Sequence, residues 1–392
     1  MSHQLIERSS DLKKLRDDGF HIEIRSGHLV IQSVPYLSDK GQLGLGVLST
    51  KLVLAGDITS TPNHVAYFTG EYPCNQNGTP IEQIRHASNR EVIDEMLSAD
   101  HSFSNQPQGG FKDYYEMMTT YVAIISGPAE LVHPTVTART FPVLAPTEES
   151  VFKYQDTATS RAGIGAVNKK IDLQKIAIVG VGGTGSYILD LVAKTPVREI
   201  HLFDGDVFLQ HNGFRSPGAP SREQLETVPT KCSYFENIYS NMRTGIVSHE
   251  YLIDEMNVEE LQEMDFVFLS MDGGEAKKII VDKLEEFNIP FVDTGMGIQL
   301  VGDSLHGVLR VTTSTSSKRD HVKGGRMSFV DTDDNNDYSS NIQIAELNAL
   351  SATLAVIKWK KVFGFYQDYD KEHHCTYTID GNHLWNEEKI EV

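Results

Sequence analysis

The glycine-rich segment after residue 179 constrains the fold of this chain most strongly. Lys175–Val179 is an apolar run rich in Ile and Val, which is typical of a buried strand in a parallel sheet. Four glycines follow it closely: Gly180, Gly182, Gly183 and Gly185. A helical pattern over Tyr187–Lys194 comes next. In such a strand–turn–helix context, glycines let the backbone approach a phosphate, and the helix N-terminus offers it free N–H groups. The sequence therefore predicts a nucleotide-binding unit.

Polar residues after the second expected strand indicate which nucleotide is bound. The strand Glu199–Phe203 leads to Asp204, about twenty residues beyond the glycines, where a carboxylate commonly holds a ribose hydroxyl. Asp206, Asn212 and Arg215 follow. An arginine binds phosphate oxygens in a bidentate manner, and an asparagine orients its neighbours, so this set favours a triphosphate over a dinucleotide.

Two further charged residues come from the next elements. Lys231 begins an amphipathic helix that we expect over residues 232–242. The segment Asp265–Met271 is predicted to be a strand of the same sheet, and Asp272 follows it. A carboxylate at the carboxyl end of a parallel strand points into the ligand crevice and is well placed to hold Mg²⁺.

The order of these motifs resembles the superfamily of ThiF, MoeB and the ubiquitin-activating enzymes. The resemblance covers about residues 155–365 and rests on GxGGxGS, DxD with N-x-x-R, a lysine on the next helix and a strand that ends in aspartate. It implies an ATP-dependent adenylyltransferase that activates the C-terminal glycine of a ubiquitin-like or sulfur-carrier protein and releases pyrophosphate. It also implies a homodimer.

The same resemblance implies a role for each matching residue. These roles are ATP binding by the four glycines, Asp204 and Asp206, phosphate binding by Asn212, Arg215 and Lys231, and Mg²⁺ binding by Asp272. In this superfamily an arginine ahead of the first strand often reaches the ATP of the partner subunit, and Arg161 is the candidate here. The paired CxxC ligands of the superfamily are missing, so we expect no structural zinc.

Composition excludes several other classes of protein. The formal net charge of −19, with no basic run, argues against a nucleic-acid partner. The three cysteines form no CxxC pair, which indicates a reducing compartment without a disulfide framework. The N-terminus is too polar for a signal peptide, and no apolar run approaches a membrane span. We therefore expect a cytoplasmic protein that does not bind membranes.

Residues 1–145 differ in pattern from the nucleotide-binding region and are expected to form a separate α+β domain. We predict a hairpin around Ser26-Gly27, a helix over Asn89–Leu97, and a helix or a strand over Tyr114–Ile125. Pro142–Glu149 is the expected boundary. This part resembles an uncharacterised domain found ahead of bacterial ThiF-type proteins. By that analogy, it docks a ubiquitin-conjugating-enzyme-like protein or the carrier, or it mediates dimerisation, within a bacterial ubiquitin-like conjugation system.

Residues 155–392 are expected to form the adenylation domain. The alternation of strands and helices predicts a Rossmann-like, mostly parallel sheet with an antiparallel extension that begins at residues 304–313. The stretch 314–340 corresponds to the crossover loop of the superfamily, which often carries a catalytic cysteine. This chain has no cysteine there. A long apolar helix is expected over Asn341–Phe363.

The missing cysteine leaves two mechanisms open. The enzyme either stops at the acyl-adenylate or transfers the carrier to another nucleophile. Ser339 and Ser340 stand about where the catalytic cysteine would be, but a serine needs a general base, and a polar loop end or helix cap is the simpler interpretation of both. Cys232 is interpreted as a core residue, and Cys375 comes too late in the chain unless the tail folds back.

Structural interpretations compete with the functional ones for single residues. Lys231 fits a solvated helix position, Asp272 fits a cap for a helix near Gly274, and Arg161 has no motif of its own. Two other functions compete as well. The first is a nicotinamide-dependent oxidoreductase, and the presence of Arg215 together with Lys231 argues against it. The second is an inactive half of a heterodimeric activating enzyme, and it is disfavoured because such a subunit would be free to lose the charged residues that this chain keeps.

Overall fold

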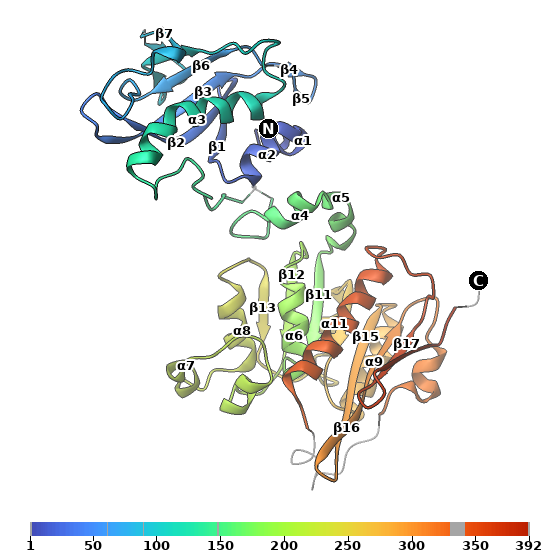
Figure 1. The fold of residues 1–392 in the computed structure, drawn as a ribbon. Coiled ribbons are helices and arrows are strands. Elements are labelled where there is room, and N and C mark those ends of the chain that lie inside the picture. Colours follow the sequence, from blue (N-terminus) through green and yellow to red (C-terminus); the bar gives the residue numbers. More distant parts are fainter. Residues whose placement is uncertain (1, 61, 89, 147–148, 330–341, 391–392) are drawn as a thin grey trace. The chain divides into compact units, whose positions relative to one another are not determined.

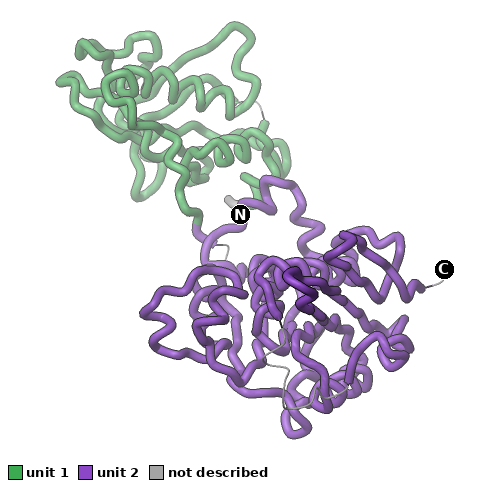
Figure 2. The backbone as a smooth tube through the Cα atoms, turned by 60° about the horizontal axis from the view of Figure 1, so that its bottom comes forward, with its two compact units in different colours: residues 1–144 green, residues 145–392 purple. Residues whose placement is uncertain are grey.

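The computed structural model describes residues 2–60, 62–88, 90–146, 149–329 and 342–390. They fall into two compact units, residues 1–144 and residues 145–392 (Figure 2). Each unit has a hydrophobic core of its own. No described helix is both long enough and apolar enough to cross a membrane.

The first unit combines helices with an antiparallel sheet (Figure 1). Its elements are α1 (Ser2–Arg8), α2 (Ser10–Asp17), β1 (Ile22–Arg25), β2 (His28–Leu37), β3 (Leu43–Lys51), β4 (Leu54–Ala55), β5 (Ile58–Thr59), β6 (Val65–Thr69), η1 (Glu82–Ile84), β7 (Arg85–Ala87), β8 (Glu91–Val92), β9 (Ser98–Ala99), β10 (His101–Ser104) and α3 (Tyr114–Val132). The main sheet has the order β1-β2-β3-β6-β10-β7.

Local signals account for much of this unit. The β1–β2 hairpin forms as predicted, because Ser26 and Gly27 both adopt positive φ values of 44° and 74°, as a two-residue turn with right-handed twist requires. The apolar stretch from residue 114 is the helix α3, which begins where the Asp113 side chain accepts a hydrogen bond from the backbone N–H of Glu116 at 2.8 Å. Tyr121 and Ile125 of α3 are fully buried.

The helix predicted over Asn89–Leu97 is wrong. The described part of that range contains strand β8 and a tight turn that leads to β9. The Asp94 carboxylate closes the turn by accepting hydrogen bonds from the backbone N–H groups of Met96 at 2.8 Å and Leu97 at 2.9 Å. A side-chain oxygen that binds nearby backbone donors competes with helix formation, and here it prevails.

The second unit alternates strands with helices. Its elements are α4 (Thr157–Ala162), α5 (Gly165–Asn168), η2 (Lys169–Ile171), β11 (Lys175–Val179), α6 (Gly183–Val192), β12 (Glu199–Phe203), η3 (Gln210–Phe214), α7 (Arg222–Glu226), α8 (Lys231–Tyr239), β13 (Ile246–His249), η4 (Val258–Glu263), β14 (Phe266–Leu269), α9 (Glu275–Glu286), β15 (Phe291–Val301), β16 (Ser304–Ser314), η5 (Val322–Arg326), α11 (Ala345–Val362), β17 (His374–Thr378) and β18 (His383–Glu387).

These strands form one sheet of order β13-β12-β11-β14-β15-β16-β17-β18. The pairings from β13 to β15 are parallel, and those from β15 to β18 are antiparallel. Helices α6, α8 and α11 pack on one face of the sheet, whereas α9 packs on the other (Figure 1). The short helix η4 shares the core of α9. The predicted fold class is confirmed: a Rossmann-like, mostly parallel sheet with an antiparallel extension, preceded by a separate α+β unit.

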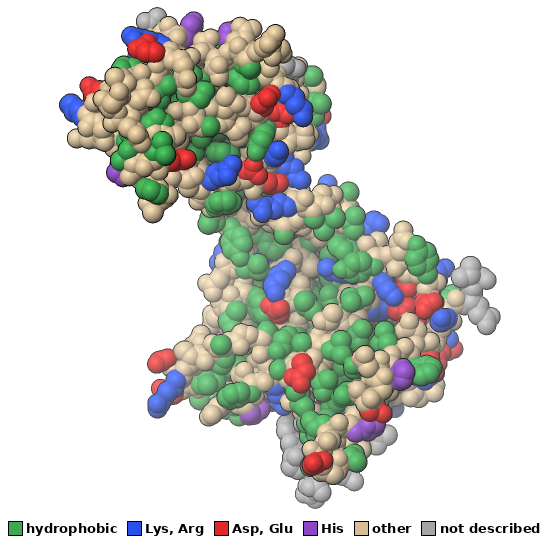
Figure 3. All heavy atoms as spheres, viewed as in Figure 1, with side chains coloured by type: hydrophobic (Ala, Val, Ile, Leu, Met, Phe, Trp, Pro, Cys, Tyr) green, Lys and Arg blue, Asp and Glu red, His purple; other side chains and the backbone are tan. Residues whose placement is uncertain are grey.

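The C-terminal part of the sheet goes beyond what the sequence predicted. After α11 the chain returns and adds β17 and β18 to the antiparallel edge, which places Cys375 within β17 opposite Val311. In the stretch expected to be a crossover loop, residues 315–329 include the short helix η5, whose Val322 is fully buried. On the face drawn in Figure 3, acidic and basic side chains are interspersed rather than gathered into one basic patch.

Candidate functional site

The glycine loop joins β11 to α6, and three of its glycines are required by packing. At Gly180, where φ is +85°, a Cβ atom would lie 2.5 Å from the carbonyl oxygen of Ser270. At Gly185 it would lie 1.9 Å from the carbonyl oxygen of Gly180, and at Gly183 it would lie 2.2 Å from Nδ2 of Asn348. A Cβ at Gly182 would meet nothing within 4 Å in the described structure.

Gly182 therefore marks the open side of the loop. It is the N-cap of α6, and no side chain caps this helix. The first N–H groups of a helix lack partners within the helix and carry a partial positive charge. A phosphate can approach such a helix start closely where no Cβ stands in the way.

Asp204, Asp206 and Lys231 form a charged cluster beside this loop. The Asp204 carboxylate is only 4 % exposed and accepts hydrogen bonds from the backbone N–H of Val181 at 2.8 Å and of Asp206 at 2.9 Å. The Lys231 ammonium lies 3.2 Å from Oδ1 of Asp204 and 2.6 Å from Oδ2 of Asp206. Two carboxylates thus hold one buried ammonium, so Lys231 is not the solvated helix residue of the simpler interpretation.

Asn212 and Arg215 lie on the η3 turn. The Asn212 side-chain oxygen accepts a hydrogen bond from the backbone N–H of Leu209 at 2.8 Å, and the main-chain carbonyl oxygen of Asn212 accepts one from the backbone N–H of Arg215 at 3.1 Å. Asn212 is buried, whereas Arg215 is partly exposed. Asn212 therefore shapes the turn that carries the arginine.

Asn348 is a member of this site that sequence reasoning missed. This residue of α11 is 1 % exposed. Its Nδ2 donates to the carbonyl oxygen of Arg215 at 3.1 Å, and its Oδ1 accepts from Oγ1 of Thr184 at 3.2 Å. The available signal was an asparagine in a largely apolar helix, but the residues that it joins are far away in the sequence.

Asp272 is exposed and lies between the end of β14 and the start of α9. The N-cap residue of α9 is Gly274, at φ 119°, so Asp272 stands two residues ahead of the N-cap position. Among the described residues, no three His, Cys, Asp or Glu side chains are grouped so that they could hold a metal ion by themselves. Mg²⁺ binding by Asp272 therefore stays a prediction.

One predicted residue, Arg161, is not brought to this cluster. Arg161 lies on α4, which Figure 1 places at the end of the sheet where β11 begins, whereas the glycine loop follows the other end of β11. A role for Arg161 at the ATP of a partner subunit stays a prediction. Ser339 and Ser340 lie outside the described residues.

All three cysteines of the chain are buried. Burial raises the pKa of the Cys232 thiol to about 12 and that of Cys375 to about 11, and it also raises the pKa of Cys74. A nucleophilic cysteine needs the opposite shift, because the thiolate is the reactive form. The structure thus agrees with the interpretation of Cys232 as a core residue.

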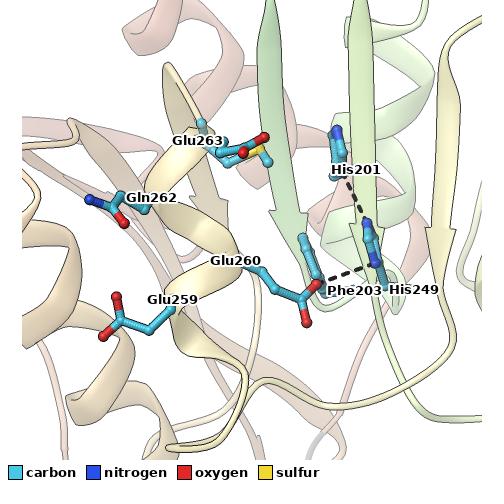
Figure 4. Close-up of a pocket in the computed structure, with 8 residues that line it drawn as sticks. His201, Phe203, His249, Glu259, Glu260, Gln262 and Glu263 are labelled. Atoms are coloured by element: carbon cyan, nitrogen blue, oxygen red, sulfur yellow. Dashed lines mark hydrogen bonds and ion pairs between the residues drawn. The ribbon is translucent and has the colours of Figure 1, made fainter.

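A separate pocket of about 570 Å³ lies between η4 and the strands β12 and β13 (Figure 4). His201 and His249 point into it and are joined by a hydrogen bond of 2.9 Å between Nδ1 and Nε2. Nδ1 of His249 forms a hydrogen bond of 2.9 Å with the hydroxyl of Tyr251. That hydroxyl donates a second hydrogen bond to the Glu260 carboxylate at 2.7 Å. This chain of hydrogen bonds was not predicted, because its residues come from three separate segments of the sequence.

Two family models match the chain, and they meet at residue 157, close to the boundary between the two structural units at residues 144 and 145. The model of the ThiF family matches residues 157–356. The model of a domain of unknown function, DUF6791, matches residues 10–157. The ThiF match covers the glycine loop, the cluster around Asp204, and Asp272.

Curated relatives match only part of the chain. Ubiquitin-like modifier-activating enzyme 5 from Mus musculus is 28 % identical over 150 residues, which are 36 % of this chain and 37 % of the mouse protein. The protein of the same name from Gallus gallus is 24 % identical over 163 residues, 39 % of this chain and 41 % of the relative. The matched region thus spans less than half the length of these relatives.

Similar solved structures include those of MccB and PaaA. The crystal structure of E. coli MccB with ATP gives a TM-score of 0.45 at 14 % identity and covers 62 % of this chain and 74 % of that chain. The crystal structure of PaaA gives a TM-score of 0.43 at 17 % identity and covers 57 % of this chain and 75 % of that chain.

Proposed function

The chain belongs to the ThiF family, and from this premise we propose that it is an ATP-dependent adenylyltransferase of the ubiquitin-like-activating type. Its substrate is the C-terminal glycine of a small carrier protein, and pyrophosphate is the leaving group. The observation that carries this proposal is the open N-terminus of α6 at Gly182, with the Asp204–Asp206–Lys231 cluster beside it. The names of the curated relatives support the same class of activity.

We propose the following roles in ATP binding. The N-terminus of α6 and Arg215 bind the triphosphate, and Asp204 and Asp206 lie where the ribose is expected. Because Lys231 is held between the two carboxylates, the incoming phosphates compete for it as a third anion. Transfer of the ammonium to the phosphates would also uncover the Asp204 carboxylate for the ribose hydroxyls. Asp272 would hold Mg²⁺, which neutralises phosphate charge when bound.

The chemical step then needs little from the protein beyond position and charge. An oxygen of the carrier's terminal carboxylate attacks the α-phosphorus, the bond to the bridging oxygen breaks, and pyrophosphate leaves with the electron pair. The attacking carboxylate is already ionised, so no general base is required. Positioning and charge neutralisation by Arg215 and Lys231 supply the catalysis.

The burial of the cysteines bears on the fate of the adenylate. Because all three thiols are buried with raised pKa values, we propose that the carrier passes to a nucleophile on another protein or to a hydroxyl such as that of Ser340.

We further propose that the chain acts as a homodimer in a bacterial ubiquitin-like conjugation system, with residues 1–144 docking a conjugating-enzyme-like partner. Activation of a sulfur carrier in cofactor biosynthesis is the alternative, since it uses the same first step.

ATP–pyrophosphate exchange with candidate carriers that end in glycine tests this proposal. We expect carrier-dependent exchange in the wild type and a loss of about 10²-fold or more in Asp272→Ala, in line with the removal of one transition-state charge contact. Asp303→Ala is the matched control, because it removes an exposed carboxylate from the β15–β16 turn. Binding of ATP without exchange for any carrier would favour a non-catalytic subunit instead.

A further inference from the structure

We propose that Asn348 is a positioning residue that fixes Arg215 relative to the glycine loop. The inference rests on the proposed function, because it assigns Arg215 to the triphosphate. Asn348 does not contact the substrate in this proposal. It acts by joining two segments that must both face the same phosphates, although they lie far apart in the sequence.

The contacts of Asn348 show how the connection is made. Its Oδ1 accepts a hydrogen bond from Thr184, in the first turn of α6, and its Nδ2 donates to the main-chain carbonyl of Arg215. One amide group therefore connects the helix start that faces the phosphate to the backbone that carries the arginine. The distances, 3.2 Å and 3.1 Å, are within the range of direct hydrogen bonds.

The chemistry of this position favours asparagine. The side chain is 1 % exposed, so its donor and acceptor must both find partners within the protein. A leucine would satisfy neither the carbonyl of Arg215 nor the hydroxyl of Thr184, and an aspartate would place an acceptor against the carbonyl. The tight fit of the amide against Gly183, where a Cβ would lie 2.2 Å from Nδ2, shows that the loop and α11 are closely packed.

Loss of this connection should change catalysis more than folding. Arg215 follows a short turn rather than a long helix, so its backbone depends on such contacts for its position. Arg215 is assigned to the triphosphate, and a charge-assisted contact of this kind contributes a factor of about 10 to 100 to affinity, so a misplaced Arg215 should weaken ATP binding. We therefore expect Asn348→Ala to raise the KM for ATP about 10- to 100-fold, with a much smaller change in the KM for the carrier.

Matched variants separate positioning from packing. Asn348→Asp keeps the shape and the acceptor for Thr184 but loses the donor, so it should resemble Asn348→Ala. Thr184→Val removes only the other hydrogen bond and should have a smaller effect. Ser351→Ala is the control, because Ser351 is equally buried on the same helix and has no part in the site. It should leave the KM for ATP unchanged.

A double-mutant cycle tests the mechanism. If Asn348 acts through Arg215, Asn348→Ala should cost nothing further in an Arg215→Ala background. Independent, multiplicative losses would overturn the inference, and so would an unchanged KM for ATP in a folded Asn348→Ala or Asn348→Asp protein. If Asn348→Ala does not fold, Asn348→Asp and Thr184→Val carry the comparison.

A binding readout separates this inference from the proposed function. The rise in melting temperature that ATP produces should be reduced in Asn348→Asp and retained in Ser351→Ala, whether or not any carrier is adenylated. Wild-type protein that shows this rise but no exchange would contradict the proposed function alone. Wild-type protein that ATP does not stabilise at all would contradict both.

Discussion

Single residues of the glycine loop serve two different purposes. A Cβ at Gly185 would meet the carbonyl oxygen of Gly180 at 1.9 Å, so this glycine is needed for the fold itself. Gly182 has φ −73° and open space around it, so the fold would accept a side chain there. We propose that the glycine at this position serves the approach of a ligand to the start of α6.

Substitution of the two glycines should therefore separate stability from ATP binding. We expect Gly185→Ala to lower the free energy of unfolding by ~1–3 kcal/mol through overpacking, or ~2–4 °C in Tm per kcal/mol for a unit of this size. Gly182→Ala should melt like the wild type but lose most of the stabilisation that ATP gives. Thermal melts with and without ATP measure both effects. If the two variants showed the same Tm and the same stabilisation by ATP, the separation between a folding role and a ligand-binding role would be contradicted.

The residues of the site differ in how far the sequence could predict them. The glycines, Asp204 and Arg215 follow a strand directly or stand in a compact motif, so local pattern indicates their function. Asn348 could not be found in this way, because its bond to Arg215 joins positions 133 residues apart. The close packing of Lys231 between Asp204 and Asp206 was also invisible in the sequence, since a lysine at a helix start is usually solvated.

At the scale of elements, strands β11 and β12 could be predicted from local sequence pattern, whereas β17 and β18 could not. The first two consist mostly of apolar residues and are buried after their first residue, which a sequence pattern indicates well. Strand β18 is exposed along its whole length and has no apolar run, so only its pairing with β17 defines it. The turn after β8 likewise depends on one aspartate that binds the backbone, which no helical periodicity reveals.

The buried histidines at the start of β17 should make the antiparallel edge sensitive to acid. Burial lowers the pKa of His373 and of His374 to about 4, from an ordinary value of 6.5. Between these values the unfolded chain binds more protons than the folded one, so the free energy of unfolding falls as the pH falls. We expect the Tm to decrease from pH 7 to pH 5 as a result.

His374→Asn provides the comparison for this prediction. An asparagine can keep the hydrogen bond to Oγ1 of Thr312, which His374 makes at 3.0 Å, but it does not titrate. The variant should therefore lose less stability than the wild type between pH 7 and pH 5. His306→Gln, at a half-exposed position on β16, should leave the pH dependence unchanged. An identical decrease in wild type and His374→Asn would contradict the assignment.

At the scale of the whole molecule, the two units have independent cores. The core of the first unit is formed by residues between positions 6 and 138, and the cores of the second by residues between 171 and 359. A protein of residues 145–392 should therefore fold, bind ATP and adenylate the carrier, but fail to pass the carrier to a conjugating-enzyme-like partner. Carrier transfer at the wild-type rate would contradict a docking role for residues 1–144, and loss of the dimer in light scattering would indicate dimerisation instead.

Direct detection of the adenylated carrier is the measurement that tests the central claim most directly. Protein, ATP, Mg²⁺ and a carrier that ends in glycine are mixed, and the intact mass of the carrier is recorded after rapid acid quenching. We predict a mass increase equal to one adenylyl group (AMP less one water), which is absent when the terminal carboxylate is amidated and absent with Asp272→Ala. An unmodified carrier under conditions where ATP is bound, or a modification that persists in the amidated carrier, would contradict the account.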